Sequence, residues 1–213
     1  MGTLSRNYHS LCITPCIAKP PLGIKNSHET QHPMKIWFTS DTHLGHRAVL
    51  SHDNRPFSSI EEHDEAIIAN HNSIVADSDH VYHLGDVAFR PASLRRYMEE
   101  ARGIKHLIRG NHDDKLAWKY KGPNPWLTRH EALYLRVDGH RLYLSHYAHR
   151  TWRNSHYGSF HLYGHSHGAL EKTPWGRSMD VGVMCHNYFP VSLDYIERTL
   201  SSRDFANHHP ATA

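Results

Sequence analysis

From about residue 34 onward, apolar and polar residues follow two different periods, one typical of strands and one typical of helices. The run from Lys35 to Thr39 is β-branched and aromatic and stops at Ser40-Asp41, which predicts a strand followed by a loop. A helix is predicted over about 59–76, because apolar residues recur there at helical spacing. Ser59 with Glu62 forms a capping box at its start. The chain therefore begins its regular structure with a strand–helix unit.

Strands and helices continue to alternate through the middle of the sequence. His80 to Leu84 predicts a second strand. Pro91 opens a second helix, which Gly103 closes. Ile104 to Ile108 predicts a third strand. This order of strand, helix, strand, helix, strand is typical of an α/β layered domain.

The later part of the domain is predicted to be rich in strands. Leu133–Val137 and Arg141–Ser145 flank Asp138-Gly139, a two-residue turn signal that favours a β-hairpin. Two further strands and a terminal helix are predicted at 161–163, 179–183 and 192–200. The α/β class therefore includes at least one antiparallel pair.

The two ends of the chain lack this periodicity. Residues 1–33 carry four prolines and are interpreted as a flexible leader, outside the native start if translation begins at Met34 rather than Met1. Met34 stands directly before the first predicted strand. Residues 201–213 are interpreted as a disordered tail. The domain is thus expected to span 34–200.

Composition and charge narrow the class of protein. The 213 residues are 38% hydrophobic and 21% charged, as in a soluble globular domain, and no stretch approaches the roughly 18 apolar residues of a membrane span. The net charge of +3 permits a phosphate-bearing substrate without indicating nucleic acid. Three cysteines argue against a disulfide scaffold and favour a reducing compartment. We expect a cytoplasmic protein.

Histidine is unusually frequent, at 23 of 213 residues, and several histidines lie directly after predicted strands together with acidic and amide residues. The set at these strand ends is Asp41, His43, Asp86, Asn111, His112, His146, His165 and His167. In open α/β sheets ligands bind at the carboxyl ends of strands, so these loops are expected to converge on one crevice. A single Asp or Asn after a strand is commonly only a turn or cap residue, but five such clusters in order outweigh that interpretation.

The residue types in this set indicate metal binding. Without His112, the set offers two carboxylates, one amide oxygen and four imidazoles, which suit borderline or hard divalent ions. Because it contains no cysteine, it disfavours a structural zinc finger. Seven ligands are too many for one four-coordinate ion. They fit two ions that share a carboxylate, the arrangement used for in-line displacement at phosphorus.

The sequence resembles the calcineurin-like metallophosphoesterase superfamily, and its small bacterial and phage branch in particular. The five ordered motifs that carry the resemblance are Asp41-Thr42-His43, Gly85-Asp86, Gly110-Asn111-His112-Asp113, His146 and Gly164-His165-Ser166-His167. The resemblance spans about 34–196. The resemblance implies a four-layer αββα sandwich with mixed sheets.

The resemblance also implies a role for each motif residue. It assigns Asp41, His43 and His167 to a first metal ion, Asn111, His146 and His165 to a second, and Asp86 to both as a bridge. The expected cofactor is therefore two divalent ions, manganese in the first place, with iron or zinc left open.

Catalysis is expected to use a hydroxide that bridges the two ions, with His112 as the general acid that protonates the leaving oxygen. Asp113 either orients that imidazole and raises its pKa or only caps a helix. Three further side chains are weaker candidates for substrate contact, namely His46, Arg109 and Arg150. An ordinary surface role is equally compatible for His46, and for the two arginines an exposed side chain without substrate contact is the commoner case.

The leading hypothesis is a hydrolase, either a phosphatase or a phosphodiesterase, that acts on a small phosphate monoester or diester, nucleotides included. A nuclease or a cyclic-nucleotide phosphodiesterase is the alternative within enzymes, although the chain shows no basic run. A non-catalytic scaffold with the same fold is the alternative of another class. No membrane and no obligatory protein partner are expected.

Overall fold

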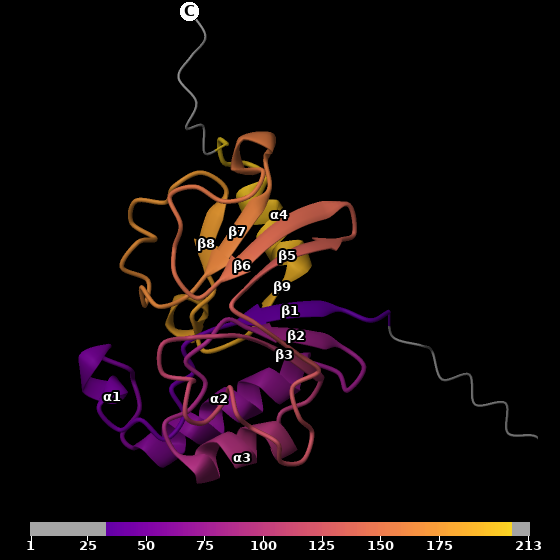
Figure 1. Cartoon of the computed structure of the whole chain (residues 1–213). Coiled ribbons are helices and arrows are strands. Elements are labelled where there is room, and N and C mark those ends of the chain that lie inside the picture. The colour runs from indigo at the N-terminus through magenta and orange to yellow at the C-terminus, as the bar shows by residue number, and fades with distance from the viewer. Residues whose placement is uncertain (1–32, 206–213) are drawn as a thin grey trace, which may run out of the picture. The chain divides into compact units, whose positions relative to one another are not determined.

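The computed structural model describes residues 33–205 of the chain (Figure 1). In chain order the elements are β1 Ile36–Thr39, α1 Val49–His52, α2 Ile60–Ile74, β2 His80–His83, α3 Pro91–Glu100, β3 Ile104–Ile108, β4 Thr128–His130, β5 Ala132–Val137, β6 His140–Ser145, η1 Ser155–Tyr157, β7 Phe160–Tyr163, β8 Ser178–Asp180, η2 Val183–His186, β9 Val191–Ser192 and α4 Leu193–Leu200. The predicted leader, apart from Pro33, and the predicted tail beyond residue 205 lie outside the described residues. Within those residues, no helix is both long and apolar enough to cross a lipid bilayer.

The first sheet has five strands in the order β4-β3-β2-β1-β9. β1, β2 and β3 run parallel, and Phe38 pairs with Tyr82 and Tyr82 with His106. The crossovers between them carry α2 and α3, as the sequence pattern predicts. β9 adds to the other side of β1 in the antiparallel direction. β4 also runs parallel, beside β3. The carboxyl ends of β1, β2 and β3 therefore meet along one edge of the sheet.

The second sheet has four strands in the order β5-β6-β7-β8. β5 and β6 form the predicted hairpin, and Asp138 and Gly139 turn it with φ angles of 46° and 79°. β6, β7 and β8 are parallel. Their carboxyl ends consequently also lie at a common edge. The α/β class with two mixed sheets is confirmed.

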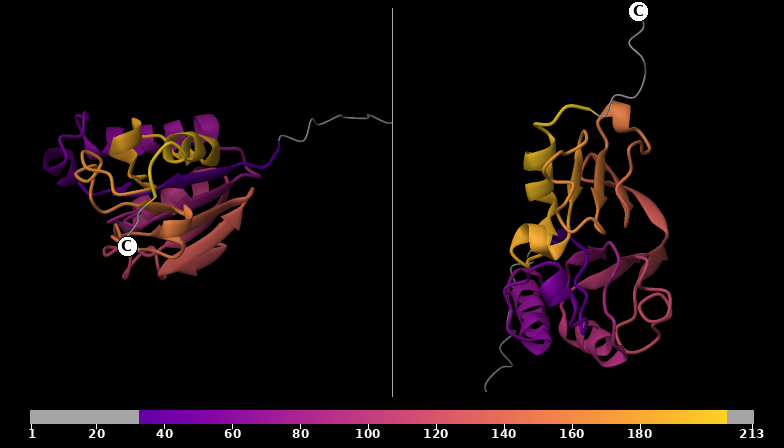
Figure 2. Two further views of the ribbon diagram at one scale, coloured as in Figure 1. Left: turned by 90° about the horizontal axis from the view of Figure 1, so that it is seen from above. Right: turned by 90° about the vertical axis from the view of Figure 1, so that its left-hand side faces the viewer.

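The main hydrophobic core lies between the two sheets. It joins the inward-facing residues of both, with Phe38 and Ile108 from the first sheet and Leu142 and Leu162 from the second. A second cluster packs α2 and α3 against the opposite face of the first sheet, around Tyr97, which is fully buried. Figure 2 shows this layering from two further directions. Burial on both faces holds the strands of the first sheet, and therefore their carboxyl ends, in fixed positions.

The covering of the second sheet differs from the four-layer expectation in one respect. α4 sends Ile196 and Leu200 into the core between the sheets. The other face of the second sheet is covered by the segment 146–159, in which the ring of Trp152 lies 5.1 Å from that of His161. This fourth layer is therefore built from irregular chain and the single turn η1 rather than from a long helix.

Some boundaries also differ from the predictions. The strand expected at 179–183 is confined to β8, because the chain turns after Asp180 and enters η2. There the N–H of Val183 bonds to Ser40, so the segment leaves the second sheet and joins the end of β1. The elements that were not predicted are α1, η1, η2, β4 and β9. Each has two to four residues, which is too short to show a period.

Candidate metal centre

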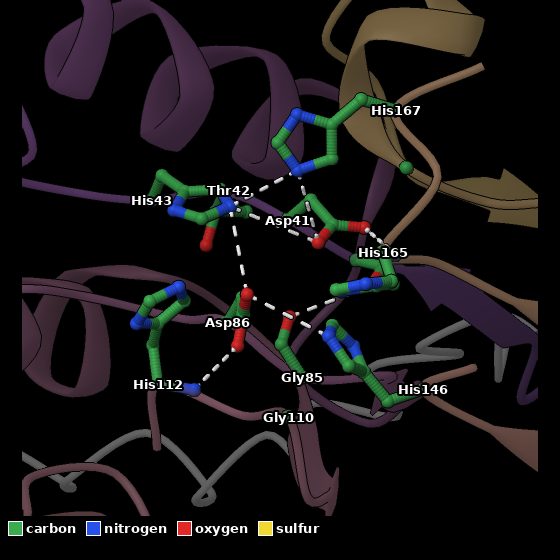
Figure 3. Close-up of polar contacts among 12 residues, drawn as sticks. Asp41, Thr42, His43, Gly85, Asp86, Gly110, His112, His146, His165 and His167 are labelled. Atoms are coloured by element: carbon green, nitrogen blue, oxygen red, sulfur yellow. Dashed lines mark hydrogen bonds and ion pairs between the residues drawn. The ribbon is translucent and has the colours of Figure 1, made fainter. Parts of the chain in front are cut away.

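The strand-end side chains of the motif set converge at the edge where the two sheets meet (Figure 3). Two groups are close enough to hold a cation each, with ligand atoms that all lie within 4.8 Å of one another. One group is Asp41, His43 and His167, and the other is Asp86, His146 and His165. Residues that are far apart in sequence thus arrive together because every strand that carries them ends at this edge.

The backbone of these loops is unusual. Several candidate ligands have positive φ angles although they are not glycine, namely Asp41 (56°), His43 (49°), Asp86 (56°), His165 (62°) and His167 (46°). Residues other than glycine rarely adopt this left-handed region of backbone angles, and Asp, Asn and His tolerate it best. The N–H of Asp41 donates to Gly85 at 3.0 Å and that of His43 to Asp86 at 3.0 Å. Hydrogen bonds between neighbouring loops therefore hold a conformation that turns the side chains inward.

The first group is arranged around the buried carboxylate of Asp41. Its Oδ2 accepts the N–H of His165 at 2.9 Å, whereas Oδ1 is buried and has no hydrogen-bond partner among the described residues. Nε2 of His43 lies 3.7 Å from Oδ1 and 3.2 Å from Nε2 of His167. Burial opposes ionisation of Asp41, but the imidazoles of His167 and His43 outweigh it and hold the pKa of the carboxyl far below its usual range. An anionic oxygen facing two imidazole nitrogens fits a divalent cation.

The second group contains the carboxylate that lies between the two groups. Oδ2 of Asp86 is 3.6 Å from Nε2 of His146 and 3.7 Å from Nε2 of His43. His146 donates its Nδ1–H to the carbonyl of Leu84 at 2.7 Å, which leaves Nε2 with its lone pair toward the site. Burial raises the pKa of Asp86, but the bond to His146 and the neighbouring charges leave it lowered overall.

Asn111 and His165 complete this side of the centre. Oδ1 of Asn111 lies 3.0 Å from Nε2 of His146, and the ring of His165 lies 5.1 Å from that of His146. Both residues are exposed, so this half of the centre faces solvent more than the Asp41 half does. The exposed ring of Tyr147 lies 4.5 Å from that of His165 and forms part of the rim.

Glycines are required where two loops touch. A Cβ on Gly164 would overlap Ser40 and the carboxylate of Asp41, and a Cβ on Gly110 would overlap Asp86. The loops after β3 and β7 therefore approach the two acidic residues as closely as backbone allows.

His112 lies beside the two groups without belonging to either. Its backbone N–H donates to Oδ1 of Asp86 at 2.9 Å. Its ring is exposed and lies 4.7 Å from that of Phe89 and 6.0 Å from that of His43. The imidazole is therefore fixed at its base, next to the centre, and free to contact a molecule bound there.

The proposed orienting role of Asp113 is wrong. Its carboxylate is fully buried and accepts three backbone N–H groups, from Asp86 at 2.9 Å, Val87 at 3.1 Å and Gly110 at 2.8 Å. Burial raises the pKa of Asp113 in spite of these bonds. The side chain thus joins the loop after β3 to the loop after β2 and does not bond the His112 ring. The alternative, a helix-capping role, names the right kind of bond, because the carboxylate accepts backbone N–H groups, but these groups belong to loops and not to a helix.

Of the weaker candidates for substrate contact, His46 lies at the site. Its ring stacks on Phe89 with centroids 3.8 Å apart and lies 5.5 Å from that of His43. Partial burial, together with the neighbouring His43 and His112, lowers the pKa of His46 to about 4. His46 therefore presents a neutral ring beside the centre.

The two arginines are engaged elsewhere. Arg109 bonds Asp114 at 2.5 Å and Glu131 at 2.6 Å, so its guanidinium is already paired with two carboxylates. Its contact with substrate stays a prediction. The guanidinium of exposed Arg150 lies over the ring of Trp175, 4.6 Å from its centroid. Among the described residues, no hydrogen bond or ion pair joins Arg150 to either metal-binding group.

Three residues that support the site were not predicted. Asp53 accepts the Nδ1–H of His167 at 2.8 Å, and Arg55 bonds Asp53 in turn at 3.0 Å. Asp180 accepts from Ser166 at 2.6 Å and from the N–H of Gly168 at 2.9 Å, and so shapes the loop that carries His165 and His167. Asp180 ends β8, so the strand-end rule could have found it. Asp53 and Arg55 lie in an irregular segment that carries no such signal.

Comparison with known proteins agrees with this architecture. The sequence model of the calcineurin-like phosphoesterase superfamily domain matches residues 34–180. An uncharacterized protein of Methanocaldococcus jannaschii is 32% identical over 174 residues, which cover 78% of this chain and 91% of that protein. The gene 66 protein of Mycobacterium phage L5 is 28% identical over 177 residues, 69% of this chain and 85% of that protein.

A solved structure supports the fold alone. The crystal structure of a protein of unknown function from Aquifex aeolicus superposes with a TM-score of 0.60 at 20% identity, over 78% of this chain and 99% of that one. The family match covers most of the described domain, and the similarity to the protein from Methanocaldococcus jannaschii extends over nearly all of that protein. This chain belongs to the calcineurin-like phosphoesterase superfamily.

Proposed function

We propose that this protein is a dinuclear metal-dependent phosphoesterase that hydrolyses a small phosphate monoester or diester. One observation carries the proposal. A single carboxylate oxygen, Oδ2 of Asp86, lies between His43 of one metal-binding group and His146 of the other, at 3.7 Å and 3.6 Å. Two cation sites with a shared carboxylate are an arrangement that serves in-line displacement at phosphorus.

The residues present fit two divalent ions. Asp41, His43 and His167 would hold the first, Asn111, His146 and His165 the second, and Asp86 both. The buried Oδ1 of Asp41, which lacks a hydrogen-bond partner among the described residues, supports this assignment. When bound, such ions supply positive charge that neutralises phosphoryl oxygens and lowers the pKa of water. Manganese is the ion we propose in the first place, and iron or zinc suits the same donors.

The chain's own residues supply the remaining functions. His112 would donate a proton to the oxygen that leaves, because its exposed ring lies beside the centre while its backbone is bonded to Asp86. The His46 ring, stacked on Phe89, would form one wall of the substrate site. Tyr147 would form another beside His165 and would contact the organic part of the ester. A nucleotide is one such ester.

The proposal is tested by an assay of metal dependence. Full-length protein is stripped with a chelator, reloaded with Mn²⁺ and assayed against an activated aryl phosphate, an alkyl monoester, an aryl diester and a cyclic nucleotide, with bound manganese measured in parallel. We expect hydrolysis that rises with occupancy up to two ions per chain. Asp86→Asn should abolish it, whereas Asp114→Asn, in the exposed carboxylate that pairs with Arg109, should not.

Other outcomes would contradict the proposal. Two bound ions without hydrolysis of any ester would indicate a non-catalytic member of the superfamily. Cleavage of oligonucleotides in preference to all four small esters, weakening steeply with added salt, would identify a nuclease instead, because phosphate contacts release counterions.

A further inference from the structure

A charged hydrogen-bond network stands behind one of the two metal-binding groups. Nδ1 of His167 donates to both carboxylate oxygens of Asp53, each at 2.8 Å, so its Nε2 faces Asp41 at 3.5 Å. Oδ2 of Asp53 in turn accepts from Nε of Arg55 at 3.1 Å and from Nη2 at 3.0 Å. The imidazole is thereby held in one tautomer and one orientation.

Arg55 connects this carboxylate to the backbone of the Asp41 loop. Its side chain is fully buried, and it donates from Nη2 to the carbonyl of Asp41 at 3.0 Å and from Nη1 to that of Thr42 at 3.3 Å. One guanidinium therefore supports Asp41 through its backbone and His167 through Asp53. Both of these residues belong to the same metal-binding group.

The network is anchored in α2. Nη1 of Arg55 lies 2.8 Å from Nε2 of His63, and Nδ1 of His63 lies 2.9 Å from Oδ1 of Asp64. Because a guanidinium only donates, Nε2 of His63 must accept and its Nδ1 must carry the proton. Asp64 also accepts the N–H of Gly45, two residues after His43. The loop that carries Asp41 and His43 is thus fixed to a helix at both ends.

The second group has no equivalent support among residues 33–205. His146 donates to a neutral backbone carbonyl, that of Leu84, and not to a carboxylate. The ring nitrogens of His165 have no hydrogen bond to any carboxylate within that range, and the side chain is exposed. A carboxylate behind a coordinating imidazole raises its basicity and fixes its direction, and removing such a partner typically weakens metal binding 10- to 100-fold.

We propose that Asp53, held by Arg55, is a positioning residue that makes the Asp41–His43–His167 site the tighter of the two metal sites. This site then fills first, and the site of Asp86, His146 and His165 exchanges its ion more readily. The inference rests on the proposed dinuclear function and adds an order of loading to it.

The test measures metal affinity directly. Metal-stripped full-length protein is titrated with Mn²⁺ in a calorimeter, alone and as Asp53→Asn. The wild type should show two binding events whose Kd values differ at least about 10-fold. Asp53→Asn should weaken the tighter event about 10- to 100-fold and leave the weaker one unchanged. Asp114→Asn, the same substitution at an exposed carboxylate, should change neither.

Two further variants, each lacking one site, show which site the tighter binding event belongs to. Asp53→Asn is repeated in a His146→Ala background, which keeps the first site, and in a His167→Ala background, which keeps the second. Affinity should fall only in the first case. Asp53→Ala, which removes the acceptor as well as the charge, should weaken the first site further. Unfolding curves of the metal-free variants show whether each is folded.

The outcomes separate this inference from the proposed function. An equal loss at both sites, or a loss in the His167→Ala background, would mean that Asp53 only stabilises the loop, and would overturn the inference. Two wild-type events of equal affinity would overturn it as well. Ordered binding without hydrolysis of any ester would support the inference while contradicting the proposed catalysis. A wild type that binds no manganese would overturn both.

Discussion

The carboxylate of Asp113 accepts the backbone N–H of Asp86 at 2.9 Å. This bond joins the loop after β3 to the loop after β2, and two further N–H groups, of Val87 and Gly110, bond to the same carboxylate. The candidate bridging ligand of the metal centre is therefore positioned by an acidic residue that coordinates nothing itself.

Asp113→Ala should destabilise the protein strongly, because it leaves three buried N–H groups without an acceptor. At roughly 1 kcal/mol or more for each, the free energy of unfolding should fall by about 3 kcal/mol or more in urea titrations. Asp114→Asn, one residue further on and exposed, should stay within about 0.5 kcal/mol of the wild type. A small effect of Asp113→Ala would show that water satisfies these groups.

His112→Ala should keep both metal ions and lose activity selectively. An ester with a good leaving group needs little protonation, whereas an alkyl ester needs a proton on the departing oxygen. The variant should therefore lose about 10²- to 10⁴-fold in kcat on alkyl esters and much less on activated aryl esters. Metal content measured alongside is the control. Equal loss on both classes would remove His112 from the role of acid.

Asp86→Asn should weaken both metal sites at once, since Oδ2 of Asp86 faces His43 and His146 alike. Asp41→Asn is the matched comparison and should weaken one site only, because its carboxylate belongs to a single group. Manganese stoichiometry after gel filtration distinguishes them. If Asp86→Asn retained two tightly bound ions, the bridging assignment would be wrong.

Gly164→Ala should damage the metal centre through sterics alone. The added methyl would overlap Ser40 and the carboxylate of Asp41, neither of which can withdraw from the buried site. We expect loss of one manganese ion and of most hydrolytic activity. Gly139→Ala is the control, because a Cβ there meets nothing within 4 Å. Because the backbone there has a positive φ of 79°, the alanine variant should lose about 1 kcal/mol of stability, and its activity should be unchanged.

Stability should fall on acidification, and His161 should account for part of the loss. Burial lowers the pKa of His161 to about 4, and the N–H of His149 donates to its Nε2 at 2.9 Å, so the ring is held neutral. As pH falls below about 6.5 the unfolded chain takes up a proton that the folded chain refuses, and stability declines until about pH 4.

His161→Gln removes this titration while keeping a donor for the Tyr143 carbonyl and an acceptor for His149. Between pH 7 and pH 5, unfolding free energies measured with a chelator present should therefore decline less steeply in the variant, by roughly 1 to 2 kcal/mol in total. Identical slopes for the two proteins would contradict the assignment.

The local pattern of the chain was enough to predict most elements that carry the site. β3 occupies Ile104–Ile108 as expected, and α2 begins after Ser59, whose Oγ accepts the N–H of Glu62 at 3.1 Å. Such features depend on residues a few positions apart, so periodicity and capping chemistry reveal them. The gathering of His43, Asp86 and Asn111 at one edge was also predictable, because they follow parallel strands of one sheet, which end together.

Only the tertiary structure decided which groups those side chains contact. Asp53 and His167 are 114 residues apart, and no local pattern links them. Likewise nothing in the sequence showed that Arg109 is neutralised by Asp114 and Glu131, or that Asp113 serves backbone amides instead of the ring beside it. The sequence by itself therefore determined the set of chemical groups and the edge at which they meet. Their partners depend on long-range packing, because burial and distance, which set each interaction, exist only once the sheets have come together.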